Sequence, residues 1–173
     1  MSKFTPPEIE KMLDSLTIIY DTRERDTSEL RKRIEGFNRP SVRKALSYGD
    51  YSAQYSLPDG EISDLTKIAV IERKQNLTEI CSNFTSERAR FQREFERAKA
   101  DNCKVHLIIE NDDYEHLRDG KYRSKLNPDS LIASLLSWAI RYGIMVHFCK
   151  PETTGYLISK IMHYSLREYL LSQ

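Results

Sequence analysis

Short apolar stretches separated by polar turns mark the strands that this chain is expected to form. The fourth stretch contains the continuous run Ala69-Val70-Ile71, which indicates a central strand. Pro58-Asp59-Gly60 has the composition of a turn between two strands. The six segments predicted as strands are Leu16–Tyr20, Val42–Tyr48, Tyr51–Leu57, Lys67–Lys74, Val105–Glu110 and Ile144–Phe148.

Apolar residues recur at helical spacing in most of the remaining chain. Asn127 is a suitable N-cap, Pro128 suits the first helical position and Gly143 a helix stop. The helical segments are a short one beginning at Pro6-Pro7, Asp26–Gly36, a turn at Leu77–Cys81, Ser86–Ala100, Pro128–Tyr142 and Pro151–Leu171, with 111–126 mostly loop. This order of elements predicts an α/β fold, a mixed sheet flanked by helices, in a single domain 1–173.

Acidic and basic residues gather at two points of this predicted sheet. Gly49-Asp50 joins two strands, and Glu72 and Lys74 project from one face of the next strand because they are two residues apart. Two carboxylates and a lysine can hold a divalent cation and a water beside a phosphodiester. The alternative is a surface salt-bridge cluster on an edge strand. Closely spaced carboxylates repel unless a cation neutralises them, which favours the metal site.

A longer string of residues occurs in the same order along the chain: Asp21-Thr22-Arg23-Glu24, Gly49-Asp50, then Glu72-Arg73-Lys74. This string resembles the nuclease domain of the XPF/Mus81 family of structure-selective DNA endonucleases, whose signature is G-D-x(n)-E-R-K-x3-D after a D-x-R-E strand. The resemblance implies a restriction-endonuclease-like fold. It also implies hydrolysis of phosphodiester bonds in branched or flap-containing DNA, with Mg²⁺ or Mn²⁺ as cofactor.

The same resemblance assigns the metal ligands by position. It makes Asp50 and Glu72 side-chain ligands and the backbone carbonyl of Ile71 a third ligand. It places Asp21 and Glu24 beside the metal, where they would act directly or through water.

Basic and amide residues complete the site that the resemblance implies. Lys74 would orient or polarise the attacking water. Arg73 lies on the opposite strand face, where an ion pair under a helix and a DNA contact are equal alternatives, and its expected part is to order the site. Arg23, Arg88 and Gln92 are expected to bind substrate. Arg88 falls within an apolar helical stripe, so it is expected to face the carboxylates, the alternative being a side chain that snorkels outward.

One position departs from the signature. Thr78 stands where the family has its last Asp, and Glu79 follows it. Thr78 is a suitable helix N-cap and could keep the structural part of that role. The departure leaves open a catalytically inactive DNA-binding or scaffold partner of the same fold. A restriction or replication-linked nuclease is a further alternative.

The formal net charge of +1 means that DNA contacts must come from local patches. The basic loop 118–125 is one candidate, in which Tyr122 could stack on an unpaired base, and a solvated surface loop is an equal alternative. The spacing of the glycines predicts no tandem helix-hairpin-helix module.

Other partners and locations follow from apolar patterning. The wide apolar surfaces of 128–142 and 155–171 suggest a homodimer or another protein partner, or else burial of the two helices against each other. No apolar run approaches eighteen residues, so no membrane contact is expected. Three widely spaced cysteines argue against a zinc site and suggest an intracellular protein.

Overall fold

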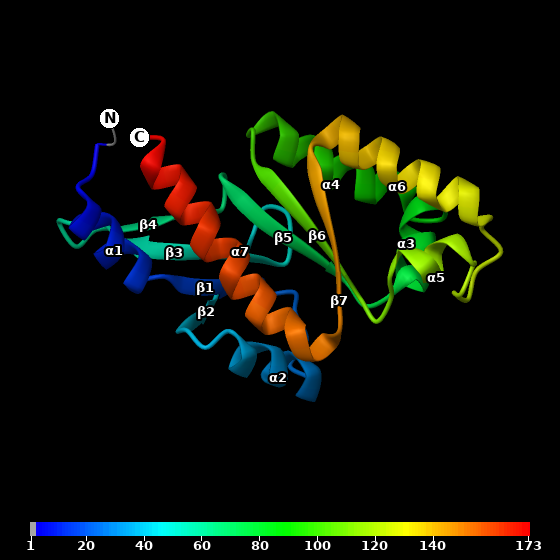
Figure 1. Cartoon of the computed structure of the whole chain (residues 1–173), viewed down its shortest axis with the longest axis horizontal. Coiled ribbons are helices and arrows are strands. Elements are labelled where there is room, and N and C mark those ends of the chain that lie inside the picture. Colours follow the sequence, from blue (N-terminus) through cyan, green and yellow to red (C-terminus); the bar gives the residue numbers. More distant parts are fainter. Residues whose placement is uncertain (1–2) are drawn as a thin grey trace.

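The computed structural model describes residues 3–173, which form one mixed sheet with helices on both faces (Figure 1). The strands are β1 (Thr17–Tyr20), β2 (Ser41–Arg43), β3 (Tyr51–Ser56), β4 (Ile62–Asp64), β5 (Ala69–Lys74), β6 (Lys104–Glu110) and β7 (Ile144–Cys149). The helices are α1 (Pro6–Asp14), α2 (Ser28–Gly36), α3 (Leu77–Phe84), α4 (Arg88–Ala100), α5 (Tyr114–Arg118), α6 (Pro128–Tyr142) and α7 (Pro151–Leu171). The predicted α/β class is confirmed.

The strand order across the sheet is β2-β1-β3-β5-β6-β7, and β4 pairs with β3 outside this path. β3 runs antiparallel to β1 and β5, whereas β5, β6 and β7 are parallel to one another. β3 and β5 share one residue pair, Tyr51 with Ile71. Regular pairing of β3 with β5 is therefore confined to the position that follows Gly49-Asp50. Glu72 and Lys74 come after the paired residue Ile71 on β5.

Each face of the sheet carries its own apolar core, because successive residues of a strand point to opposite faces. One core joins α1 and α7 to the sheet, with Met12, Leu16, Ile158, Met162 and Leu166 almost fully buried. The other joins α3, α4 and α6 around an aromatic cluster made of Phe84, Phe91, Phe95 and Trp138.

The late helices α6 and α7 therefore lie on opposite faces of the sheet, as Figure 1 shows, and the suggestion that they bury each other is wrong. α7 packs instead on α2 at very short range. A Cβ on Gly155 would collide with the carbonyl oxygen of Arg33 and lie 2.9 Å from the Cα of Gly36. Glycine is thus required here for the close approach of two backbones.

Several element boundaries differ from those predicted. In the predicted strand 42–48, regular pairing stops at Arg43, and the chain turns because the Leu46 N–H donates to the Asp21 carboxylate. β4 and α5 were not predicted, and each is too short, at 3 and 5 residues, to leave a clear apolar period. Between residues 3 and 173 we find no helix with the length and apolar character needed to cross a membrane.

Candidate active site

Asp50 reaches the central strand β5 because Gly49 precedes it. Gly49 has φ +75°, and a Cβ there would lie 3.0 Å from the Val70 Cβ. The Asp50 N–H donates to the Ile71 carbonyl at 2.7 Å, and Asp50 Oδ2 accepts from the Arg73 N–H at 2.8 Å. These two bonds clamp the Asp50 backbone and carboxylate beside the strand that carries the second carboxylate.

Glu72 and Lys74 form a close, buried ion pair on β5. Lys74 Nζ lies 2.8 Å from Glu72 Oε1 and 3.6 Å from Glu79 Oε1, and it sits 5.0 Å from the centroid of the Phe91 ring. Both side chains are buried but border a cleft of ≈ 320 Å³. The other charged residues lining this cleft are Arg23, Glu24, Asp50, Arg73, Glu79, Arg90 and Glu94.

The cleft disfavours the ionised form of its two central carboxylates, Asp50 and Glu72. Burial raises the pKa of Asp50 well above its usual range, and the neighbouring Glu72 raises it further. Burial also raises the pKa of Glu72, although Lys74 opposes this shift. For Lys74, burial acts to lower the pKa, but the charge and hydrogen bond of Glu72 outweigh it and raise the pKa. Lys74 is therefore an ammonium ion at neutral pH.

The donors in the cleft suit a hard divalent cation. Asp50 and Glu72 offer carboxylate oxygens, and the Ile71 carbonyl that accepts from Asp50 retains a second lone pair. Within residues 3–173 no three His, Cys, Asp or Glu side chains are grouped as a metal site. Two carboxylates and a main-chain carbonyl form an oxygen-only set of the kind Mg²⁺ and Mn²⁺ prefer, with water completing the coordination, so the residues fit such an ion.

Asp21 does not share this cleft, contrary to its predicted role as a metal ligand. Its Oδ1 accepts from the N–H and Nε of Arg23 at 2.8 and 2.6 Å, and its Oδ2 accepts from the Leu46 N–H at 2.6 Å. Burial acts to raise the pKa of Asp21, but these bonds hold it below its usual value. Asp21 is a buried turn-former, and it positions Arg23, whose NH2 also donates to the Gly49 carbonyl at 3.1 Å.

Glu24 borders the cleft and is held from the opposite side. Its Oε2 accepts from the Tyr51 hydroxyl at 2.7 Å and lies 3.5 Å from NH1 of Arg33. The charge of Glu24 also contributes to the raised pKa of Asp50. Glu24 is thus close enough to influence the site electrostatically, which is consistent with its predicted place beside the metal.

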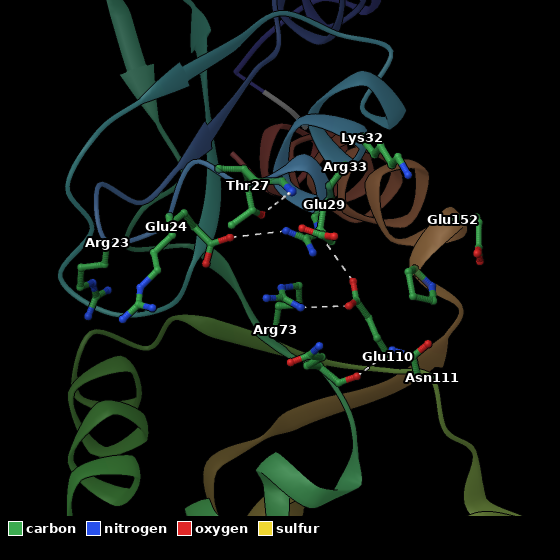
Figure 2. Close-up of a pocket in the computed structure, with 14 residues that line it drawn as sticks. Arg23, Glu24, Thr27, Glu29, Lys32, Arg33, Arg73, Glu110, Asn111 and Glu152 are labelled. Carbon is green, nitrogen blue, oxygen red and sulfur yellow. Dashed lines mark hydrogen bonds and ion pairs between the residues drawn. The ribbon is translucent and has the colours of Figure 1, made fainter.

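Arg73 belongs to a buried network on the other face of β5 (Figure 2). Its NH1 donates to Glu110 Oε2 at 2.9 Å, while Glu110 Oε1 accepts from the Thr154 hydroxyl at 2.6 Å and lies 3.5 Å from Nε of Arg33. The network joins β5, β6, α2 and α7. Of the two alternatives for Arg73, the structure shows the ion pair under a helix.

The prediction that Arg88 faces the carboxylates is wrong. Arg88 is exposed at the first position of α4, its NH1 donates to the Phe84 carbonyl at 3.3 Å, and its guanidinium lies 5.2 Å from the Trp138 ring centroid. Gln92 does not line the cleft either, since its Nε2 donates to Glu96 Oε1 at 2.8 Å. At the start of a helix the side chain can leave the apolar stripe, as the snorkelling alternative required.

Two residues of the same helix occupy the place expected for Arg88. Arg90 and Glu94 both line the cleft, and the charge of Glu94 raises the pKa of Glu72. Arg90 is exposed and also pairs with Glu87 at 2.8 Å, and neither Arg90 nor Glu94 was singled out from the sequence. The available signal was their spacing of four residues, on the border of the apolar stripe beside Phe91.

Thr78, which replaces the last Asp of the family signature, does not have the capping role predicted for it. Asn76, not Thr78, caps α3, because its side chain accepts from the Glu79 N–H at 3.0 Å. Thr78 Oγ1 instead accepts from the Arg123 N–H at 3.0 Å, which ties the basic loop to α3. Tyr122 is half-buried against the aromatic side of the sheet, and its hydroxyl donates to the Leu126 carbonyl at 2.8 Å, so the fold holds its ring in place.

Comparison with known proteins identifies the family of the chain. The model of the ERCC4 domain matches residues 20–161, so the chain belongs to the ERCC4 domain family, which is the XPF/Mus81 nuclease family. Among solved structures, it is similar to XPF from Aeropyrum pernix, with TM-score 0.62, 22% identity and coverage of 87% of this chain and 65% of that one. A structure described as XPF from Aeropyrum pernix, complex with DNA, gives TM-score 0.61, 21% identity and coverage of 88% and 66%. Comparison with curated protein sequences gave no match.

Proposed function

We propose that this chain is a divalent-metal-dependent DNA endonuclease that hydrolyses phosphodiester bonds in branched or flap-containing DNA. One observation carries the proposal: Asp50 and Glu72 are held in one cleft with raised pKa values, and Lys74 lies 2.8 Å from Glu72. Membership of the ERCC4 domain family supports a DNA nuclease. The chain spans about two thirds of the length of the solved XPF chains. The substrate and partners proposed below are therefore those of the domain described above.

In the proposed mechanism, the carboxylates of Asp50 and Glu72 and the carbonyl of Ile71 would hold Mg²⁺ or Mn²⁺. The bound ion would supply Lewis acidity, both toward the scissile phosphate and toward the attacking water. Lys74 is a charged donor and cannot accept the proton of that water. It would therefore orient the water and stabilise negative charge on the phosphate oxygens.

A second candidate is a non-catalytic DNA-binding or scaffold partner with the same fold. The observation that favours it is Thr78, which turns toward the loop instead of presenting a carboxylate to Lys74. Glu79 favours the nuclease instead, because it supplies a carboxylate one residue after Thr78 and its Oε1 lies 3.6 Å from Lys74 Nζ. A cleavage assay distinguishes the two candidates.

The proposed partner besides DNA is a second copy of the chain or another protein. Exposed apolar side chains lie on α6 and on the edge strand β7, where Ile140 is 85% exposed, Leu136 44% and Met145 40%. Because α6 and β7 are neighbours, a protein partner could cover these apolar side chains together.

The test is cleavage of duplex, flap, fork and four-way DNA with Mg²⁺, with Mn²⁺ and with EDTA. We expect cuts near the branch of flap or fork DNA that require a metal ion and disappear in Asp50→Asn. Asp14→Asn is the matched control, since Asp14 is an exposed carboxylate on α1 outside the cleft. Full activity in EDTA would refute metal dependence. A DNA-binding protein that cuts none of these substrates would establish the scaffold alternative.

A further inference from the structure

A second, larger hollow adjoins the proposed catalytic cleft. It has a volume of ≈ 790 Å³ and is walled by α2, the ends of β5 and β6 and the first turn of α7 (Figure 2). Arg23, Glu24 and Arg73 line both this hollow and the cleft. A strand whose phosphate lies in the cleft would therefore continue past these three side chains into the hollow.

The inner wall of the hollow is a fixed polar surface. Arg33 is only 6% exposed and is held between Glu24, Tyr51 and Glu110. Glu110 is itself fixed by the Thr154 hydroxyl. The Nε atoms of Arg33 and Arg73 are buried and form no hydrogen bond within the described structure. Two planar guanidinium groups, each fixed by Glu110, thus meet at this wall.

The charge of the lining decides which part of a nucleic acid fits. Five basic and four acidic side chains line the hollow, together with the amides of Gln75 and Asn111. A phosphate would need a clear excess of positive charge, whereas a nucleobase is neutral and carries both donors and acceptors on its edge. Closely mixed donors and acceptors therefore suit a base, and guanidinium planes give it a stacking surface.

We propose that this hollow receives an unpaired nucleotide next to the scissile phosphate. The inference rests on the proposed nuclease function and deepens it, since it names the feature of the substrate that is recognised. A pocket of this size falls in the range that encloses small organic ligands. A base paired in a duplex cannot enter a pocket, so DNA that is single-stranded on one side of the cut would avoid the cost of unpairing.

The rim of the hollow carries two cationic side chains, of which Arg25 would stack on the base and Lys32 would contact a neighbouring phosphate. Arg25 and Lys32 are exposed there, and no carboxylate among residues 3–173 forms an ion pair with either. Arg31, on the same helix as Lys32, is paired with Asp26 at 2.9 Å and lies outside the hollow. Arg31 therefore provides a control of equal charge.

The experiment combines changes in the hollow with removal of one base. Flap DNA carries either a normal nucleotide or an abasic one beside the mapped cut, in the unpaired strand. For the wild type, we expect the abasic substrate to bind about ten-fold more weakly, the loss typical of one stacked base. In Arg25→Ala/Gln75→Ala the abasic change should cost much less, because base and pocket act together. In Arg31→Ala it should cost the full ten-fold.

A fluorescence measurement separates this proposal from the nuclease proposal. 2-Aminopurine replaces the same base, and Asp50→Asn protein with Mg²⁺ keeps the DNA uncut. We expect its emission to change on binding, and the change to shrink when Arg25→Ala/Gln75→Ala is added. An equal abasic penalty in wild type and pocket variant, or unchanged emission, would overturn the pocket even if the DNA is cleaved. Emission changes in Asp50→Asn, together with a wild type that cuts none of the DNA substrates, would retain the pocket and refute the nuclease.

Discussion

At the scale of single residues, the carboxylate of Asp50 opposes folding. Burial and the neighbouring Glu72 raise its pKa above the unfolded value, so its ionisation destabilises the folded state as pH rises. Catalytic sites commonly retain such unfavourable groups because their chemistry requires them.

We predict that Asp50→Asn raises the free energy of unfolding at pH 7 in EDTA by about 1 kcal/mol while it abolishes cleavage. The Asn Oδ1 can still accept the Arg73 N–H, so only the charge is lost. Urea denaturation measures the change. The gain should shrink as pH falls toward the unfolded pKa of Asp, where the wild-type carboxyl is also neutral. A less stable variant would contradict this electrostatic account.

The protonation of His106, a residue outside the cleft, also makes stability depend on pH. Its Nδ1 lies 3.0 Å from Nε2 of His147, and burial, then His147, lowers the pKa of His106 from 6.5 to about 4. The folded pKa is below the unfolded one. The neutral ring therefore contributes stability that is complete above pH 6.5 and is lost as pH falls toward 4.

We predict that the wild type loses roughly 2 kcal/mol more stability than His106→Gln between pH 7.5 and pH 5. Urea unfolding at the two pH values measures this difference, and the titrating groups that do not contact His106 cancel in the comparison. Equal pH dependence of the two proteins would show that His106 accepts its proton freely in the folded state.

The residues that sequence reasoning located were those whose function follows from strand geometry. Glu72 and Lys74 share a face because they are two apart in a strand, and the structure places them 2.8 Å from each other. Glu94 and Arg90 were missed because the rotation of α4 relative to the sheet is set by tertiary packing. The Asp21 carboxylate was misassigned, because an acid that caps a turn has the same sequence signature as a metal ligand.

At the scale of elements, the order of long helices and strands could be predicted because each carries an apolar period. Asn127, Pro128 and Gly143 bound α6 as expected, with the Gly143 φ at +67°. Short elements such as β4 depend on pairing with a neighbour already in place, which a local pattern does not contain. The close contact of α2 and α7 was likewise invisible, although Gly155 inside a helical segment was its one signal.

The contact between α2 and α7 predicts that Gly155→Ala lowers stability, although helix propensity alone would predict an increase. Ala in place of Gly155 would favour the helix by about 1 kcal/mol, but its Cβ would collide with the backbone of α2. We expect Gly155→Ala to lose roughly 2 kcal/mol of stability, because two backbones must separate. Gly36→Ala should lose less, since its Cβ would lie 3.3 Å from the Gly155 Cα. Thermal unfolding of both variants measures this, and a stabilised Gly155→Ala would contradict the packing.

At the scale of the whole molecule, the apolar patch on α6 and β7 predicts self-association. Light scattering at micromolar concentration should give twice the chain mass, and Ile140→Glu should return it to one chain mass because a charge would be buried at the centre of the patch. Tyr164→Glu, at an exposed aromatic on α7, is the control on the opposite face of the sheet. A monomeric wild type would instead favour a different protein as the partner.

The packing of α7 also has a consequence for how the protein is made. The core that joins α1 to the sheet is completed by Ile158, Met162 and Leu166, which a ribosome adds after every strand. A nascent chain that already carries Asp50 and Glu72 therefore has one face of its sheet covered by α1 but not yet by α7, and Glu110 lacks its Thr154 partner. Folding of this half must wait for the end of α7, and until then the exposed apolar face is the surface that a chaperone would meet.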